Sequence, residues 1–354
     1  ILRSGMVYCQ SVKICYNVQD KQIKQCNVSD LKFLSRRYRM EKYYNKAMQI
    51  MDEVNKVVMG KGIIISKVLT AILAKGHILL EDNPGVGKTT LALAFSKAMA
   101  LEYHRLQFTP DILPTDVVGF HLLSREGESY QYKPGAIMCN LFLADEINRT
   151  SSKTQSALLE VMEEGKVTVD SITREVPKPF VVIATQNPLG SVGTQMLPES
   201  QLDRFMIKLT MGYPDRKSEI DILKQRQNTN PLDQVVTVAC KEDIIAMQNM
   251  VENVFIHDSI YEYITLLAEQ TRINPLIELG ISPRGSLALM NMVKATAFLG
   301  KRDYVIPSDV SYIFKDVAAH RIVLKPKARV NNVTVDNLLD DILRIVKPPR
   351  ILSK

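Results

Sequence analysis

The residues that suggest chemistry most directly form a glycine-rich segment at positions 83–90, between a short apolar run and an apolar helical pattern. Glycines let backbone N–H groups turn toward phosphate oxygens without interference from a side chain. A helix that begins near Thr89 would direct its positive end at the same anion. Lys88 is suited to the β- and γ-phosphates, and the Thr89 hydroxyl is suited to Mg²⁺. The residues expected to contact a nucleotide here are Pro84, Gly85, Val86, Gly87, Lys88, Thr89 and Thr90.

A pair of carboxylates follows another apolar run, Leu141–Ala144. Adjacent strand residues point to opposite faces, so Asp145 and Glu146 can take different roles. The carboxyl ends of strands are the usual ligand edge of an open α/β sheet. We therefore expect Asp145 to hold hydrated Mg²⁺, and Glu146 to orient and deprotonate an attacking water.

Further polar side chains have the charge or hydrogen-bonding capacity that phosphoryl transfer requires. Asn187 follows a third apolar run and is suited to bond the γ-phosphate or the water. Arginines stabilise the charge on the transferring group. Three are candidates, Arg149, Arg204 and Arg284, although a single arginine is more often a solvated surface residue. The residue types alone leave that alternative open for each of them.

The elements that must position these residues alternate between helical patterns and short buried strands. Strands are predicted at 76–81, 141–144, 180–184 and 207–211, and a hairpin at 166–176. Helices are predicted at 41–59, 63–75, 89–100 and 153–164, and several more after residue 213. Buried strands that alternate with helices indicate a parallel sheet covered on both faces, with a domain boundary near 213.

The charge of the chain is unevenly distributed. Its net charge is +7, but residues 1–39 hold eight basic and two acidic residues, so the remainder is close to neutral. This argues against nucleic acid as a partner. We expect residues 1–39 to be an atypical basic leader foreign to the rest, the alternative being a tail that binds a partner. Unpaired cysteines after residue 39 and the lack of a long apolar run predict a cytoplasmic protein.

With these motifs in order, the chain resembles the AAA+ ATPases, and specifically the MoxR group. The matching segments are Leu79–Thr90, Phe108–Asp116, Asp145–Glu164, Ala184–Pro188, Leu197–Phe205 and Ser282–Arg284. The resemblance implies a three-layer α/β ATPase core with a parallel sheet over 40–212, and a small all-α lid over 213–345, with a tail at 346–354. It also implies a ring, commonly a hexamer, with ATP between neighbouring subunits.

The same resemblance assigns roles to the candidate residues. Lys88 and Thr89 correspond to Walker A, Asp145 and Glu146 to Walker B, and Asn187 to sensor 1. Arg204 would be the finger that acts on the ATP of the next subunit. Arg284 would be sensor 2, reaching the ATP of its own subunit. Asp82 stands where the general loop pattern has glycine, a departure that MoxR-type loops tolerate.

The family resemblance also suggests what ATP hydrolysis serves. Members are thought to act as chaperone-like remodellers, often with a von Willebrand factor A domain partner, in metal insertion or in maturation of a client protein complex. Segments 107–134 and 165–176 resemble elements that face the pore or the client. Two other functions stay open: a nucleic-acid motor or transcription activator, and a non-hydrolysing scaffold. The near-neutral charge of the chain after residue 39 disfavours the nucleic-acid function. The joint presence of Glu146, Asn187 and Arg204 disfavours the scaffold.

Overall fold

The computed structural model describes residues 14–17, 22–25, 28–83, 85–123, 130–187, 197–227 and 230–350. The chain divides into two units, residues 1–45 and residues 46–354. In the first unit, β1 (Ile14–Asn17) and β2 (Gln22–Gln25) pair antiparallel, and the long helix α1 (Val28–Asn55) begins. Across the described ranges, no helix has the length and apolar character that crossing a membrane requires.

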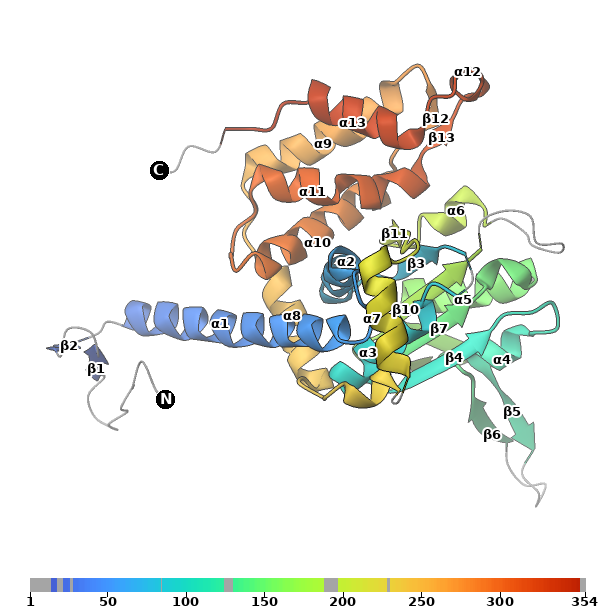
Figure 1. The fold of residues 1–354 in the computed structure, drawn as a ribbon, viewed down its shortest axis with the longest axis horizontal. Helices are drawn as coiled ribbons and strands as arrows, with labels where there is room; N and C mark the ends of the chain where they lie inside the picture. Colours follow the sequence, from blue (N-terminus) through green and yellow to red (C-terminus); the bar gives the residue numbers. More distant parts are fainter. Residues whose placement is uncertain are drawn as a thin grey trace. The chain divides into compact units, whose positions relative to one another are not determined.

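The second unit is built on a parallel five-stranded sheet (Figure 1). Its strands, in chain order, are β3 (Ile78–Glu81), β4 (Tyr103–Gln107), β7 (Leu141–Asp145), β10 (Val181–Gln186) and β11 (Ile207–Leu209). They lie in the order β11-β3-β10-β7-β4, and every neighbouring pair is parallel. The parallel sheet predicted from the sequence is thus confirmed. Strand β4, at one edge, was not predicted.

Both faces of this sheet are covered. Phe142, Ala144 and Val182 belong to one buried cluster with Leu158 and Met162 of the helix α5 (Ser152–Glu164). Side chains alternate across a strand, so Leu141, Leu143, Val181 and Ile183 must point to the opposite face. All four are fully buried as well. Parallel strands buried on both faces read as continuous apolar runs, which is why β7 and β10 were evident in the sequence.

The remaining elements of the core connect or cover these strands. Its other helices are α2 (Gly62–Leu73), α3 (Lys88–Ala98), α4 (Pro114–Val118) and the 3₁₀ turn η1 (Ile147–Arg149). Two antiparallel hairpins project from it: β5 (Gly119–Leu123) with β6 (Tyr130–Pro134), and β8 (Lys166–Val169) with β9 (Ile172–Glu175). The segment before the lid contains the short helix α6 (Glu199–Leu202).

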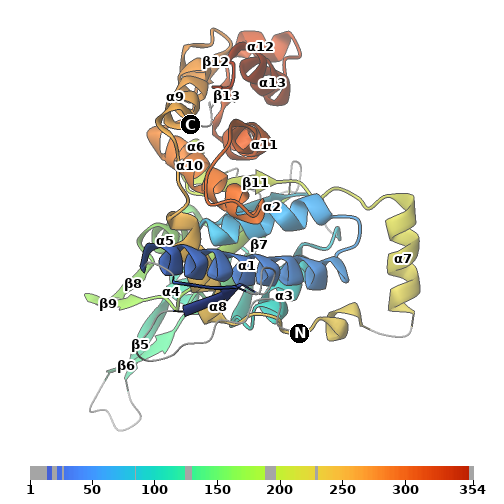
Figure 2. The same cartoon turned by 90° about the vertical axis from the view of Figure 1, so that its left-hand side faces the viewer.

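After β11 the described chain is mainly helical. Figure 2 shows α7 (Arg216–Arg226) standing off from the sheet, followed by η2 (Pro231–Gln234) and α8 (Lys241–Glu252). The lid, orange to red in Figure 1, comprises α9 (Asp258–Ile273), α10 (Pro283–Leu299), α11 (Pro307–Ala318), η3 (Ala319–Arg321), α12 (Pro326–Val330) and α13 (Val335–Ile345). It also holds a small antiparallel pair, β12 (Ile277–Leu279) with β13 (Val323–Leu324).

Candidate functional site

The glycine-rich segment forms the loop that leads from β3 into α3. Gly85 and Gly87 adopt φ values of 84° and 99°, in the left-handed region that residues with a side chain rarely enter. Among the described residues, Gly85 and its chain neighbours aside, no atom lies within 4 Å of where a Cβ would stand on Gly85, so the loop is open on that side. Gly87 is the N-cap of α3, so the N–H groups in the first turn of this helix have no partner within the helix and can bind an anion.

Asp82, which replaces the usual first glycine, connects this loop to the end of the sheet. Its buried carboxylate accepts one hydrogen bond from the Asn83 N–H (3.0 Å) and one from the Gly212 N–H (2.6 Å). Gly212 lies just after β11, where the chain leaves the core. The carboxylate therefore fixes the start of the loop to the segment that leads toward the lid, which a glycine could not do.

Lys88 lies at the centre of the site. Its buried ammonium donates to the carbonyl oxygen of Asp82 (2.7 Å) and to Oδ1 of Asn187 (3.3 Å). Burial lowers the pKa of Lys88, and the negative charges of Asp82, Asp145 and Glu146 act in the opposite direction. A cation held among acceptors near a helix N-terminus is suited to bind phosphate oxygens.

Asp145 ends β7 with both carboxylate oxygens engaged. Oδ1 accepts from the Thr185 hydroxyl (2.6 Å), and Oδ2 accepts from Nη2 (2.7 Å) and Nε (3.1 Å) of Arg105. Arg105 lies on the edge strand β4 and Thr185 on β10, so the strands on either side of β7 both hold this carboxylate. Neither residue was given a role from the sequence.

Glu146 follows directly and has a strained backbone. Its φ of 58° and ψ of 48° lie in the left-handed region, a conformation that concentrates at functional sites and costs about 1–3 kcal/mol. Its N–H donates to the Thr185 hydroxyl oxygen (2.9 Å). Its carboxylate accepts from Asn187 Nδ2 (3.0 Å) and from Arg149 Nη1 (2.8 Å). The side chain is thus fixed at the mouth of the site by one amide and one guanidinium.

These side chains share one pocket of about 400 Å³, lined by Gly85, Gly87, Lys88, Thr89, Thr90, Arg105, Gln107, Asp145, Glu146 and Asn187. Eight of the predicted site residues are therefore brought together. Val86 lies in the loop but does not line the pocket, and Pro84 lies outside the described residues. Gln107 and Arg105 were missed because β4 was missed. Arg105 and Gln107 are two residues apart, and residues at that spacing in a strand lie on the same face of the sheet, which was the available signal.

The composition of the pocket fits a magnesium–nucleotide complex. One side supplies a lysine and the first turn of a helix, which bind anions. The other side supplies carboxylate oxygen from Asp145, and Thr89, which carries a hydroxyl, lines the same pocket. Mg²⁺ prefers oxygen ligands and is usually held by one or two protein groups together with substrate phosphates. The residues present match that requirement.

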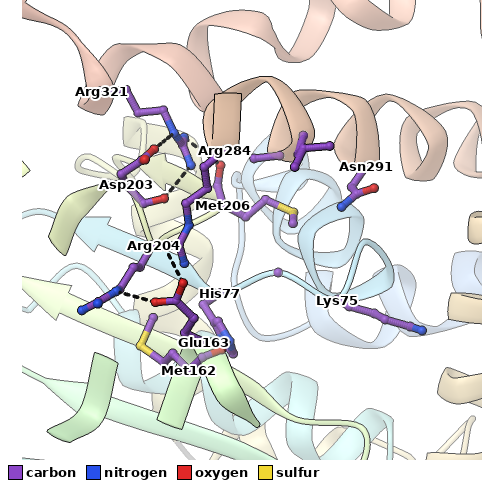
Figure 3. Close-up of a pocket in the computed structure, with 13 residues that line it drawn as sticks. Lys75, His77, Met162, Glu163, Asp203, Arg204, Met206, Arg284, Asn291 and Arg321 are labelled. Carbon is purple, nitrogen blue, oxygen red and sulfur yellow. Dashed lines mark hydrogen bonds and ion pairs between the residues drawn. The ribbon is translucent and has the colours of Figure 1, made fainter. Parts of the chain in front are cut away.

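Arg204 and Arg284 occupy a different place. They line a second pocket of about 210 Å³, together with Glu163 at the end of α5 (Figure 3). One Glu163 oxygen accepts from Arg204 Nε (3.0 Å), and the other accepts from Arg284 Nη1 (3.0 Å). All three side chains are partly exposed. Two guanidinium groups are therefore held side by side by one carboxylate.

Arg284, which the resemblance places beside the ATP of its own subunit, lines the second pocket in the described structure, and its role stays a prediction. Arg284 lies in the first turn of α10, whose N-cap is Ser282. The Ser282 hydroxyl donates to Asp203 Oδ2 (2.8 Å), which places the start of this helix against the segment that carries Arg204. Arg284 does not line the phosphate-loop pocket of the described structure. Packing of the lid thus decides which site this arginine can serve.

Comparisons with known proteins agree with the fold and the motifs. The family described as "ATPase family associated with various cellular activities (AAA)" matches residues 77–207, and the AAA lid domain family matches residues 269–342. The chain is 48% identical to the uncharacterized protein YeaC of Bacillus subtilis, over 84% of this chain and 93% of that protein. It is 35% identical to "Chaperone MoxR1" of Mycobacterium tuberculosis, over 84% of this chain and 81% of that protein. The crystal structure of a putative ATPase from Cytophaga hutchinsonii superposes with a TM-score of 0.84 at 36% identity, covering 90% of this chain and 100% of that one.

Proposed function

Because this chain belongs to the MoxR group of AAA+ ATPases, we propose that it hydrolyses ATP in the phosphate-loop pocket and that a neighbouring copy completes the site. One observation carries this proposal: Lys88, Asn187 and Glu146 form a continuous hydrogen-bonded series across the pocket. A cation for the phosphates and a carboxylate for the water are thereby held on opposite sides of one amide.

Most residues of the pocket then have a definite task. The backbone of the loop and Lys88 bind the phosphates, as the family pattern predicts. Thr89 and Asp145 would hold Mg²⁺, which when bound neutralises charge on the β- and γ-phosphates. Glu146 accepts a proton from the attacking water, and Asn187 orients both that carboxylate and the water. Thr185 and Arg105 keep Asp145 in place.

The positive charge needed over the transferring phosphoryl group comes, in this proposal, from the adjacent subunit. Arg149 of the same chain is already paired with Glu146. Arg204 and Arg284 lie in the second pocket, partly exposed and adjacent to each other. An arginine supplied by another subunit accelerates phosphoryl transfer by about 10³–10⁵. We assign Arg204 this role, and we place Arg284 beside it on the same neighbouring ATP.

At the level of biology, we propose that hydrolysis drives chaperone-like remodelling or maturation of a client protein complex. The similarity to a protein named Chaperone MoxR1 supports the general class. A hexameric ring, a von Willebrand factor A domain partner, cofactor or metal insertion into the client, and a cytoplasmic location are further parts of this proposal. They follow from the family resemblance, and pull-down from a native extract with the Glu146→Gln protein tests the partners.

Two measurements test the core of the proposal. The ATPase rate per subunit should rise with protein concentration, because assembly completes each site. Arg204→Ala and Lys88→Ala should each be inactive alone, and an equimolar mixture should regain part of the rate. In the mixture, intact pockets meet intact arginines at some interfaces. Arg344→Ala, which changes an exposed arginine of α13, is the matched control and should behave as wild type. A rate independent of concentration, with no recovery at any mixing ratio, would contradict the proposal.

A further inference from the structure

The residue immediately before Arg204 receives two hydrogen bonds from the lid. Asp203 Oδ2 accepts from the Ser282 hydroxyl (2.8 Å), and Oδ1 accepts from Nε of Arg321 (2.7 Å). Figure 3 shows Arg321 pointing from the lid toward Asp203, next to Arg204 and Arg284. The Arg321 side chain is only 2% exposed. A charge-assisted bond of this kind, shielded from water, is stronger than a surface ion pair.

The same guanidinium also binds the backbone on both sides of Arg204. Arg321 Nη2 donates to the carbonyl oxygens of Asp203 (3.1 Å) and Phe205 (2.6 Å), and Nη1 donates to that of Met206 (3.3 Å). The neighbouring His320 also contacts the Phe205 carbonyl through Nε2 (3.1 Å). The chain that carries Arg204 is thus fixed to the lid before and after the arginine.

We propose that Asp203 and Arg321 are positioning residues. They join the lid to the Arg204 segment, residues 203–206, so that the two form one block. This block presents Arg204 and Arg284 together to the ATP of the adjacent subunit. The inference rests on the proposed function, in which those arginines act between subunits. It adds that the lid of one subunit sets the geometry of hydrolysis in the next. A displacement of about 1 Å in such a group can lower the rate about 10²-fold.

The test uses Asp203→Asn, which keeps the size of the side chain and removes its charge. Its homomer should lose about 10- to 100-fold in kcat while it keeps wild-type nucleotide affinity, because its own pocket is intact. Mixing it with Lys88→Ala should restore activity, since that protein contributes an intact arginine block. Mixing Asp203→Asn with Arg204→Ala should not restore activity, since neither protein contributes an intact arginine block. Asp341→Asn, at an exposed ion pair with Arg344 on α13, is the control and should keep full activity.

Two outcomes overturn the inference while leaving the proposed function standing. One is an Asp203→Asn homomer with full turnover. The other is a loss that Lys88→Ala does not rescue, although the Arg204→Ala and Lys88→Ala mixture recovers. If neither Asp203→Asn nor Arg204→Ala recovers activity when mixed with Lys88→Ala, the proposed role of Arg204 between subunits is overturned, and this inference with it. Should Asp203→Asn fail to fold, Ser282→Ala is the second variant. It removes one of the two bonds and should show the same pattern of rescue with a smaller, few-fold loss.

Discussion

Asn187 donates from Nδ2 to Oε1 of Glu146 over 3.0 Å, while its Oδ1 accepts from the Lys88 ammonium over 3.3 Å. An amide carries a donor and an acceptor on separate atoms, so one side chain can orient an anion and a cation at the same time. The phosphate-binding lysine and the proposed base are therefore held in a fixed relation. Changes at Glu146 or Asn187 should affect the chemical step more than nucleotide binding.

Glu146→Gln should retain nucleotide affinity close to wild type and lose about 10²–10⁴ in kcat, because the phosphate loop is intact and the base is gone. Binding is measured by titration with a fluorescent nucleotide, and turnover by phosphate release. Glu262→Gln, on the exposed side of α9, makes the same chemical change outside both pockets and should keep wild-type affinity and turnover. Turnover in Glu146→Gln within a few-fold of wild type would exclude Glu146 as the base.

Asn187→Ala should lower kcat by about 10- to 100-fold with little change in KM, since the carboxylate loses a bond that orients it. Asn249→Ala, on the exposed side of α8, is the matched control and should keep wild-type kinetics. A rise in KM with unchanged kcat would show that Asn187 serves only to bind ATP. Steady-state kinetics at several ATP concentrations separate these results.

Thr185→Val should destabilise the protein and slow hydrolysis together. The buried hydroxyl donates to Asp145 and accepts from the Glu146 N–H, so an isosteric valine leaves both groups without this partner. A buried polar group left unpaired costs about 1–3 kcal/mol. Urea unfolding should show a loss of that size. Thr185→Ser keeps the hydroxyl and should remain near wild type, and equal effects of the two substitutions would refute the hydroxyl's role.

His77 should make stability depend on pH below neutrality. Its Nδ1 accepts from the Val182 N–H and its Nε2 donates to the Met162 carbonyl oxygen, so the buried ring is neutral. Burial is the main reason that its pKa falls to about 4 from an ordinary value of 6.5; the charge of Arg284 adds to this, and the Met162 bond opposes it. Between these two values the unfolded chain binds more protons at this position than the folded chain does. Stability should therefore fall as pH drops from about 6.5 to about 4, and level off below.

The expected loss from His77 is on the order of 3 kcal/mol across that range, about 1.4 kcal/mol per pH unit. Urea unfolding at pH 7 and pH 5 covers the upper part of that range, where about 2 kcal/mol of the loss is expected, with His77→Gln as the comparison. Burial also lowers the pKa of His320, so some dependence should persist in that variant. An unchanged difference between the two pH values in His77→Gln would show that His77 is not responsible.

Much of the phosphate-loop pocket could be located from the sequence because its signals are local. The strands β3, β7 and β10 are buried on both faces and read as apolar runs, and a polar residue marks where β7 and β10 end. In a parallel sheet those ends meet at one edge. The edge strand β4 escaped notice because Tyr103–Gln107 is partly exposed and polar. Arg105, which binds Asp145, was missed with it.

The sequence by itself determined the family, the loop and the polar residues at the strand ends, since each depends on a few neighbouring positions. Only the tertiary structure decided where Arg284 lies and that Asp203 joins the lid to the Arg204 segment. Ser282 and Asp203 are 79 positions apart, and Arg321 and Asp203 are 118 apart. Contacts at such separations depend on how the lid packs against the core, and no pattern of adjacent residues records that.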